Sequence, residues 1–397
     1  MIQELLAVAG GIILGAIAGL LPAVHNNTIA SLVLSLNLGV PAQALSLFII
    51  SLACAKLVFE FIPSIFLFIP NENSVLAVLP GHRLSLEGKG GFALRLSAFS
   101  ALLSLFFCAL LLPLALHAFP PLYSAVRPFT GPFLACACAF LLLSERSSGN
   151  IILASLVFLL SGILGLIVLR SPCFIDPLLP SFTGLFAVPA ILLSFNQRQG
   201  AAQEKSPAPF NPLRFLPHIL AGTLLGFLAD LFPGLSSASQ VAFFATLLIP
   251  TATEGFLALI ASLSASHLFF SIAALFSAGK ARVGATVAVK ELLGNPSPSD
   301  SALLVSGAIL SFALSSMLLL ILAPKLVSLV SKISSRTLSI SSFAFILLVV
   351  SCISGAQGLL VLFTASCIGL IAPLSGIRRT HVMALILVPA IFYQFGA

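Results

Sequence analysis

The chain of 397 residues is strongly apolar, because 59% of its residues are hydrophobic and 7% are charged. Soluble domains carry about 25% charged residues, so this composition excludes a water-soluble globular or disordered protein. The formal net charge of +7 does not indicate nucleic-acid binding, because the basic residues are scattered at segment ends and form no stripe. The composition predicts a multi-pass protein of the cell membrane that is in contact with lipid.

Long, continuous apolar runs predict membrane-spanning helices and not the alternating strands of a β-barrel. In chain order we expect apolar segments at Leu5–Leu21, Ile29–Leu38, Ala44–Ile69, Ala98–Leu116, Pro132–Leu143, Ile151–Leu169, Phe182–Phe195, Phe215–Leu231, Val241–Ile249, Phe256–Phe276, Ala302–Leu322, Leu338–Ile353, Leu359–Pro373 and His381–Phe395. Since a full span needs about 20 residues, Ile29–Leu38 and Val241–Ile249 are too short to cross alone. They are predicted to be broken or re-entrant helices near the membrane midplane.

A hydrophilic linker, residues 196–213, divides the chain into two transmembrane halves of similar length, residues 1–195 and 214–397. Residues of the first half recur 211 positions later in the second half (222 − 11 for the first pair): Gly11, Gly15, Leu20, Pro22, Ser51, Leu52 and Phe59 match Gly222, Gly226, Leu231, Pro233, Ser262, Leu263 and Phe270. We therefore expect an all-α polytopic membrane protein with two repeated halves, inverted relative to each other.

Each half places a proline and then a polar cluster directly after its glycine-rich helix. The residues are Pro22, His25, Asn26, Asn27 and Thr28 in the first half, and Pro233, Gly234, Ser236, Ser237, Ser239 and Gln240 in the second. Proline ends or kinks a helix, and Asn, Ser and Thr are preferred N-caps of the next one. Two helix N-termini would favour an anion, so these residues are predicted to bind substrate. The alternative is a plain turn at the membrane surface.

Glycines and charges near these clusters have separate predicted roles. Small-residue faces let helices approach closely, which is the role expected of Gly11, Gly15, Gly19, Gly222 and Gly226. Charges inside apolar runs are unfavourable, so Asp230, Lys56, Glu60 and His267 are predicted to act in ion coupling or as counter-charges. Lys56 and His267 are also related by the offset of 211. The alternative for Lys56 and Glu60, one helical turn apart, is mutual neutralisation with a structural role.

The stretches Gly11–Pro22 and Leu79–Gly90, with Pro233-Gly234 in the second half, resemble the large membrane subunit of the tripartite tricarboxylate transporters, the TctA family, and its shorter archaeal-type relatives. The first half departs from the family's Pro-Gly motif, with Ala23 in place of Gly. The resemblance implies a secondary permease for a small organic anion of the carboxylate type, driven by Na⁺ or H⁺. It also implies a small membrane subunit and a solute-binding protein as partners, and self-association stays open.

Three alternatives remain from the sequence. The proline motifs also resemble those of undecaprenyl-phosphate transporters, which implies a lipid phosphate as substrate. Gly234–Ala238 is one residue from the G-x-S-x-G nucleophile elbow, and with His267 it would suit an intramembrane hydrolase, although we expect no enzyme. A membrane scaffold is the third. The seven cysteines are interpreted as packing residues, so we expect no metal site and no cofactor other than Na⁺ as a coupling ion.

Overall fold

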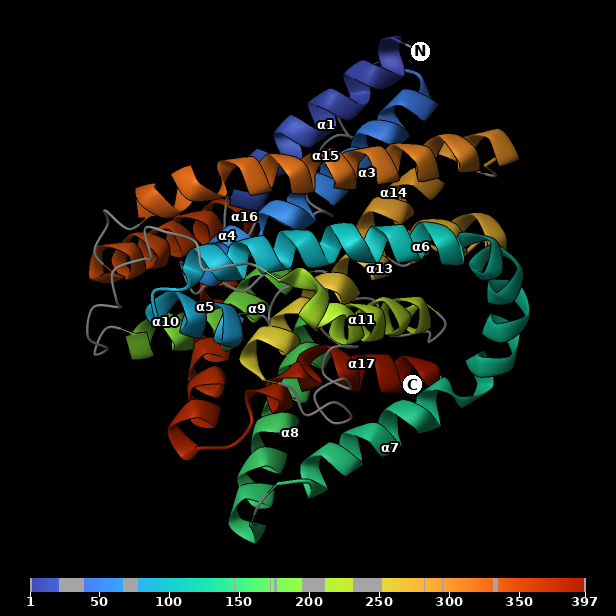
Figure 1. Ribbon diagram of the computed structural model, residues 1–397. Coiled ribbons are helices and arrows are strands. Elements are labelled where there is room, and N and C mark those ends of the chain that lie inside the picture. Colours follow the sequence, from blue (N-terminus) through green and yellow to red (C-terminus); the bar gives the residue numbers. More distant parts are fainter. Residues whose placement is uncertain are drawn as a thin grey trace.

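The computed structural model describes residues 2–20, 39–66, 78–145, 147–171, 173–174, 177–194, 211–230, 252–281, 283–294, 296–330 and 335–395. Every regular element in these ranges is helical (Figure 1). The helices of the first half are α1 (Ile2–Leu20), α3 (Ala42–Phe59), α4 (Phe61–Phe66), α5 (Val78–Leu86), α6 (Gly90–Val126), η2 (Arg127–Phe129), α7 (Thr130–Leu143), α8 (Ser148–Arg170), α9 (Leu178–Phe182), η3 (Thr183–Ala187) and α10 (Val188–Ser194). Those of the second half are η4 (Pro212–Phe215), α11 (Leu216–Ala229), α13 (Thr253–Ala278), α14 (Gly284–Leu293), α15 (Pro298–Val330), α16 (Ser335–Ser375), η5 (Arg379–Met383) and α17 (Ala384–Gln394).

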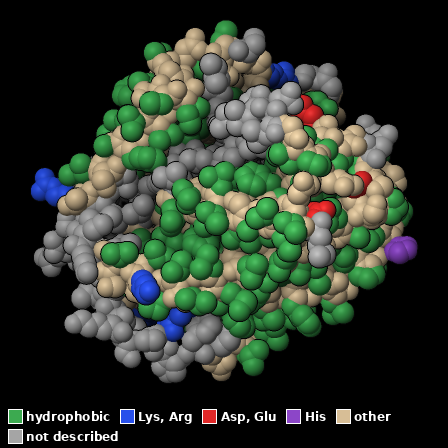
Figure 2. Space-filling model, turned by 90° about the horizontal axis from the view of Figure 1, so that it is seen from above, with side chains coloured by type: hydrophobic (Ala, Val, Ile, Leu, Met, Phe, Trp, Pro, Cys, Tyr) green, Lys and Arg blue, Asp and Glu red, His purple; other side chains and the backbone are tan. Residues whose placement is uncertain are grey.

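Seven helices in the described residues are long and apolar enough to cross a membrane, which confirms a polytopic helical membrane protein. They are Ile2–Leu20, Ala42–Phe66, Gly90–Val126, Ser148–Arg170, Thr253–Ala278, Pro298–Leu329 and Phe343–Ser375. Hydrophobic side chains cover much of the described surface in Figure 2, and charged groups are few on that face. Phe106, Leu110, Phe140, Ile152 and Phe363 are among the exposed large apolar residues, as expected of a surface that faces lipid.

Helix boundaries differ from the predicted segments at identifiable places. The predicted break between Ile353 and Leu359 is present, because Gly355 has a positive φ of 63° inside α16. Two stretches between predicted apolar segments, residues 70–97 and 277–301, contain the short helices α5 and α14, which the apolar runs did not predict. The two short predicted segments, Ile29–Leu38 and Val241–Ile249, lie outside the described residues.

Two helices form the buried centre, and each is packed by a glycine-rich helix. The continuous pair α3–α4 and the helix α13 are buried along nearly their whole length. Helix α1 packs on α3, and α11 packs on α13. A Cβ atom at Gly11 would lie 2.7 Å from Cβ of Ser51, and one at Gly222 would lie 2.9 Å from Cβ of Ser262. A side chain at Gly11 or Gly222 would therefore prevent this close approach of the backbones.

The helices of the two halves interleave. Helix α3 packs against α15 while α13 packs against α6, and α14 packs against α3 while α5 packs against α13. Farther along the chain, α8 packs against α17, and α16 packs against α9, η3 and α10. In Figure 1, α7, α8 and α17 occupy the lower part of the view, and α1, α3 and α15 the upper part. The division into two repeats at residues 196–213 stays a prediction about the sequence.

Candidate functional site

The polar clusters predicted to bind substrate lie outside the described residues. This holds for Pro22, His25, Asn26, Asn27 and Thr28, and for Pro233, Gly234, Ser236, Ser237, Ser239 and Gln240. The structure does describe the helices on either side of both clusters. Helix α1 ends at Leu20 and α3 begins at Ala42, while α11 ends at Ala229 and α13 begins at Thr253. The predicted coupling and counter-charge residues are on these flanking helices.

Lys56 and Glu60 form an ion pair in the buried centre. Lys56 Nζ lies 3.3 Å from Glu60 Oε2, and the two side chains are 5% and 0% exposed. Glu60 sits where α3 gives way to α4, and its backbone carbonyl accepts a hydrogen bond of 2.8 Å from Ser64 Oγ. Pro63 has no N–H to continue the helical ladder, which explains the change of helix at this point. A buried ion pair in an apolar segment is a functional candidate, because desolvation makes it a poor source of stability.

Asp230 and His267 form a second buried pair, brought together from two helices. His267 Nε2 lies 3.9 Å from Asp230 Oδ1, and the side chains are 2% and 0% exposed. Asp230 caps the C-terminus of α11, where the negative end of the helix dipole disfavours a carboxylate. Capping therefore does not explain Asp230, and His267 forms an ion pair with it only when the imidazole is protonated.

The two pairs are related in sequence but differ in construction. Lys56 and His267 occupy positions 211 residues apart, and each is the basic member of its pair. The position equivalent to Asp230 in the first half is Gly19, where a Cβ atom would lie 2.7 Å from the carbonyl oxygen of Lys56. A side chain at Gly19 would force neighbouring atoms of α3 to move. The carboxylate of the first half comes instead from Glu60, directly after the helix that carries Lys56. The second half instead forms its pair from two helices, α11 and α13.

Buried serines join the two halves where their helices cross. Ser311 Oγ on α15 donates to Ser51 Oγ on α3 at 2.8 Å. The residues displaced by 211, Ser262 on α13 and Ser100 on α6, are joined as well, with Ser262 Oγ donating to the Ser100 carbonyl at 3.2 Å. Ser104 Oγ also donates to the Ser262 carbonyl at 3.0 Å. Such hydroxyl contacts stabilise helix crossings in membranes.

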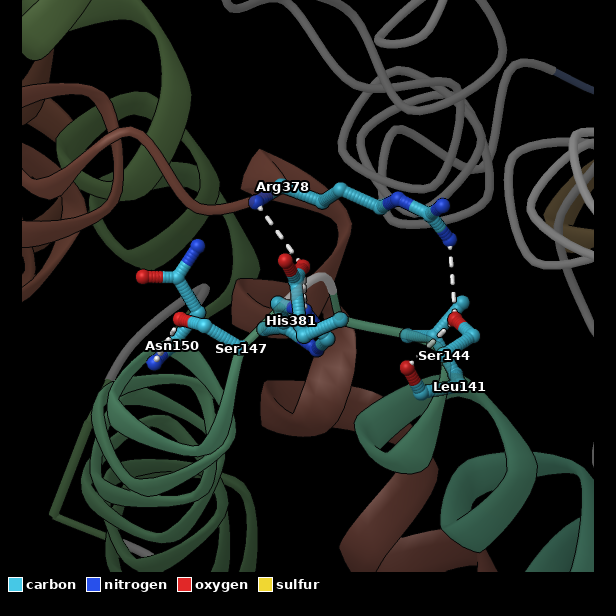
Figure 3. A network of polar contacts seen from close by, with 7 residues as sticks. Leu141, Ser144, Ser147, Asn150, Arg378 and His381 are labelled. Carbon is cyan, nitrogen blue, oxygen red and sulfur yellow. Dashed lines mark hydrogen bonds and ion pairs between the residues drawn. The ribbon is translucent and has the colours of Figure 1, made fainter.

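A third charged cluster was not predicted from the sequence (Figure 3). His381 Nε2 donates to Glu145 Oε1 at 2.8 Å, and the backbone N–H of Arg378 donates to the same oxygen at 3.2 Å. Arg378 Nη1 donates to Ser144 Oγ at 2.9 Å. The cluster ties the turn between α7 and α8 to the segment between α16 and η5. Glu145 between two apolar runs was a visible signal, but its partner is 236 positions away.

Burial and hydrogen bonding shift the pKa of both members of this cluster, which lies beyond the ends of the apolar spans. Burial of the imidazole lowers the pKa of His381 below its usual value, against the hydrogen bond and charge of Glu145, which raise it. Burial raises the pKa of the Glu145 carboxyl, but hydrogen bonds and charges from His381 and Arg378 outweigh it, so the net pKa is lowered. The cluster is therefore a neutral imidazole that donates to an ionised carboxylate at neutral pH.

No group of three His, Cys, Asp or Glu side chains in the described ranges is arranged to hold a metal ion. Cys54 and Cys108 are completely buried in the apolar core, and Cys136, Cys173, Cys352 and Cys367 are exposed.

Comparison with known proteins gives two matches. The sequence profile of the tripartite tricarboxylate transporter TctA family matches residues 5–384. The chain is also 28% identical to the uncharacterized protein MJ1079 of Methanocaldococcus jannaschii, over 96% of this chain and 97% of that protein. No solved structure matches the chain. The match to the TctA profile spans both halves and both buried charge pairs.

Proposed function

Because the chain belongs to the TctA family and is thus a membrane transporter and not an enzyme, we propose that it is a secondary-active permease for a small organic anion of the carboxylate type. Uptake is coupled to H⁺ or Na⁺. The hydrolase alternative is not supported, since Ser236 and His267 belong to a chain from a transporter family.

The observation that carries this proposal is the presence of two buried charge pairs, each next to one predicted interruption. An organic anion needs positive charge in a site from which water is excluded, and Lys56 and His267 are buried basic groups. A coupling cation needs a carboxylate, and Glu60 and Asp230 are 0% and 2% exposed. An arrangement that holds both signs of charge deep in the protein suits the joint movement of an anion and a cation.

The substrate-binding shell is proposed at the two polar clusters, together with the N-termini of the helices that follow them. It comprises His25, Asn26, Asn27 and Thr28 from the first half, and Ser236, Ser237, Ser239 and Gln240 from the second. Asp230 is the proposed coupling-ion ligand, and backbone carbonyls at Pro22 and Pro233 contribute if the ion is Na⁺. Lys56 is the proposed counter-charge for the anion.

A small membrane subunit and a solute-binding protein are the proposed partners, as the name of the tripartite family indicates. The described chain contributes the membrane helices in which the charge pairs lie. We propose that the anion reaches these helices after release from the solute-binding protein.

A thermal-unfolding screen of the purified protein tests the proposal. Citrate, succinate and a polyprenyl phosphate are each added with Na⁺ or K⁺, at about pH 6 and about pH 8, because a ligand raises the unfolding temperature of the state it binds. We expect a carboxylate to raise the unfolding temperature, and the coupling cation to enlarge that shift. The matched control is Lys56→Gln/Glu60→Gln, which removes the buried charges as a pair and should lose the response. Stabilisation by the polyprenyl phosphate alone would instead identify a lipid-phosphate transporter, and no response to any ligand would point to a scaffold.

A further inference from the structure

The described helices fall into two bodies that do not coincide with the two halves of the sequence. Body A consists of α1, α3–α6, α11 and α13–α15, with the short turn η4. Body B consists of α7–α10, α16 and α17, with the short turns η2, η3 and η5. Each body contains helices from both halves of the chain. Among the described helices, every pair in extensive contact belongs to one body, except α6 and η2, which are consecutive in the chain.

Body A is held together across the halves by polar contacts in its interior. Ser51 and Ser311 join α3 to α15, and Ser262 and Ser100 join α13 to α6. At the ends of the helices, Gln43 Nε2 donates to Asp300 Oδ1 at 2.8 Å. Moving one half of the chain against the other would break all three contacts. The two serine contacts are buried, and buried polar groups left without partners are unfavourable.

Body B is held together across the halves by close backbone packing. A Cβ atom at Gly165 on α8 would overlap the carbonyl group of Leu385 on α17, and one at Gly369 on α16 would overlap the carbonyl group of Leu185 in η3. Ser161 Oγ on α8 donates to the Val382 carbonyl in η5. The Glu145–His381 contact adds a charged link between the same halves. Backbones packed this closely leave no room for sliding between α8 and α17, or between α16 and η3.

Both buried charge pairs belong to body A. Lys56 and Glu60 are at the junction of α3 and α4, and Asp230 and His267 are on α11 and α13. Body B contributes the cluster at Glu145 but neither of the two buried pairs. Body A thus carries the proposed counter-charge, Lys56, and the proposed coupling-ion ligand, Asp230. Its described helices make few close contacts with the described helices of body B.

We propose that transport occurs by displacement of body A as a unit against body B, and not by movement of the first half of the chain against the second. This inference rests on the proposed function, because a permease must expose its site to the two sides of the membrane alternately. The junction of Val126 and Arg127, where α6 leaves body A and η2 enters body B, is one of the places where the chain must absorb that displacement.

Distances between pairs of spin labels test this inference. The labels are attached to cysteines introduced at four exposed positions, in a variant whose seven native cysteines are replaced by alanine or serine: Arg83 on α5, Glu291 on α14, Ser148 on α8 and Gln357 on α16. Arg83–Glu291 and Ser148–Gln357 join different halves within one body. Arg83–Ser148 and Glu291–Gln357 join different bodies within one half. The protein is measured in lipid nanodiscs with and without citrate, in Na⁺ and in K⁺.

We expect the two pairs between bodies to give broad or shifted distance distributions, and the two pairs within a body to give narrow distributions that stay constant. The inference is overturned if the pairs within a body change while those between bodies do not, because the halves would then be the moving units. It is overturned equally if all four distributions are narrow and the same in every condition. The label distances report movement and not flux. If the distances between bodies change in a protein that neither binds nor transports citrate, the result counts against the proposed function and not against the two moving bodies.

Discussion

Ser311 Oγ on α15 donates a hydrogen bond of 2.8 Å to Ser51 Oγ on α3, and so links the second half of the chain to the first. The residues displaced by 211 positions, Ser100 and Ser262, are hydrogen-bonded as well, again between the two halves. Both contacts are buried inside body A. A covalent bond in place of the first contact would therefore join the halves without joining the bodies.

Cross-linking of Ser51→Cys/Ser311→Cys is expected to leave citrate uptake close to that of the reduced protein. The physical reason is that the two positions keep their separation when body A moves as a unit. Uptake by proteoliposomes is measured before and after oxidation, with each single cysteine variant as a control for oxidation itself. Loss of uptake on cross-linking, restored by a reductant, would show that α3 and α15 must separate during transport.

Gly222→Leu is expected to destabilise the protein by about 1–3 kcal/mol, the usual cost of overpacking a well-packed interface. The side chain would be forced against Ser262 Cβ and the Leu259 carbonyl, so α11 could not keep its approach to α13. Thermal unfolding in detergent measures the effect. Gly149→Leu is the matched control, because a Cβ atom at Gly149 on α8 has no neighbour within 4 Å. Equal stability of the two variants would contradict the close approach.

Acidification is expected to destabilise the protein through His381. Its pKa in the folded protein is lowered, so the unfolded chain takes up a proton first as the pH falls below about 6.5. The stability that His381 contributes is therefore present above about pH 6.5 and is lost as the pH falls through the lowered pKa. The pKa of Glu145 is lowered below the usual carboxyl value, so the stability that Glu145 contributes is lost only at more acidic pH than that of His381.

The unfolding temperature between about pH 8 and about pH 5 measures this effect in the wild type and in His381→Gln, which keeps a donor for Glu145. The wild type should lose more stability than the variant over this range. Parallel curves would show that His381 is as readily protonated in the folded protein as in the unfolded chain.

Asp230→Asn/His267→Gln is expected to uncouple transport. Removing one member of a buried ion pair destabilises a protein by about 3–5 kcal/mol, so both members are replaced by neutral side chains that can still hydrogen-bond. Exchange of labelled for unlabelled citrate across the membrane should persist, while accumulation driven by a cation gradient should fall at least about tenfold. Accumulation equal to that of the wild type would exclude Asp230 and His267 as the coupling groups.

Much of the fold follows from local patterns of apolar residues in the sequence. The apolar runs predicted the spans, and the lack of strong apolar character between Ile353 and Leu359 predicted the break that Gly355 makes in α16. Helices α5 and α14 were missed because they are short and of mixed polarity, so their apolar residues give no spanning signal. Helix α6 extends to Val126, beyond the predicted Ala98–Leu116, because it continues through Pro120 and Pro121, although proline usually ends or kinks a helix.

Only part of the candidate site could be predicted from the sequence, because some of its contacts depend on how distant helices pack. Lys56 and Glu60 lie one turn apart, so their contact follows from helical periodicity. Asp230 and His267 were each predicted as charges in apolar segments, but their pairing depends on the packing of α11 on α13. Glu145 and His381 meet through the interleaving of the two halves, and no pattern in one sequence reports which distant helices will pack together.

Secondary-active transport of a carboxylate is tested by the accumulation of radiolabelled citrate and succinate in proteoliposomes, with the proposed small membrane subunit and solute-binding protein present, under an imposed inward gradient of H⁺ or of Na⁺. We expect that at least one of these carboxylates rises inside the vesicles above its outside concentration, that one cation gradient is required, and that an ionophore for that cation abolishes the accumulation. Equal inside and outside concentrations under both gradients, in vesicles whose protein is folded and correctly inserted, would contradict it.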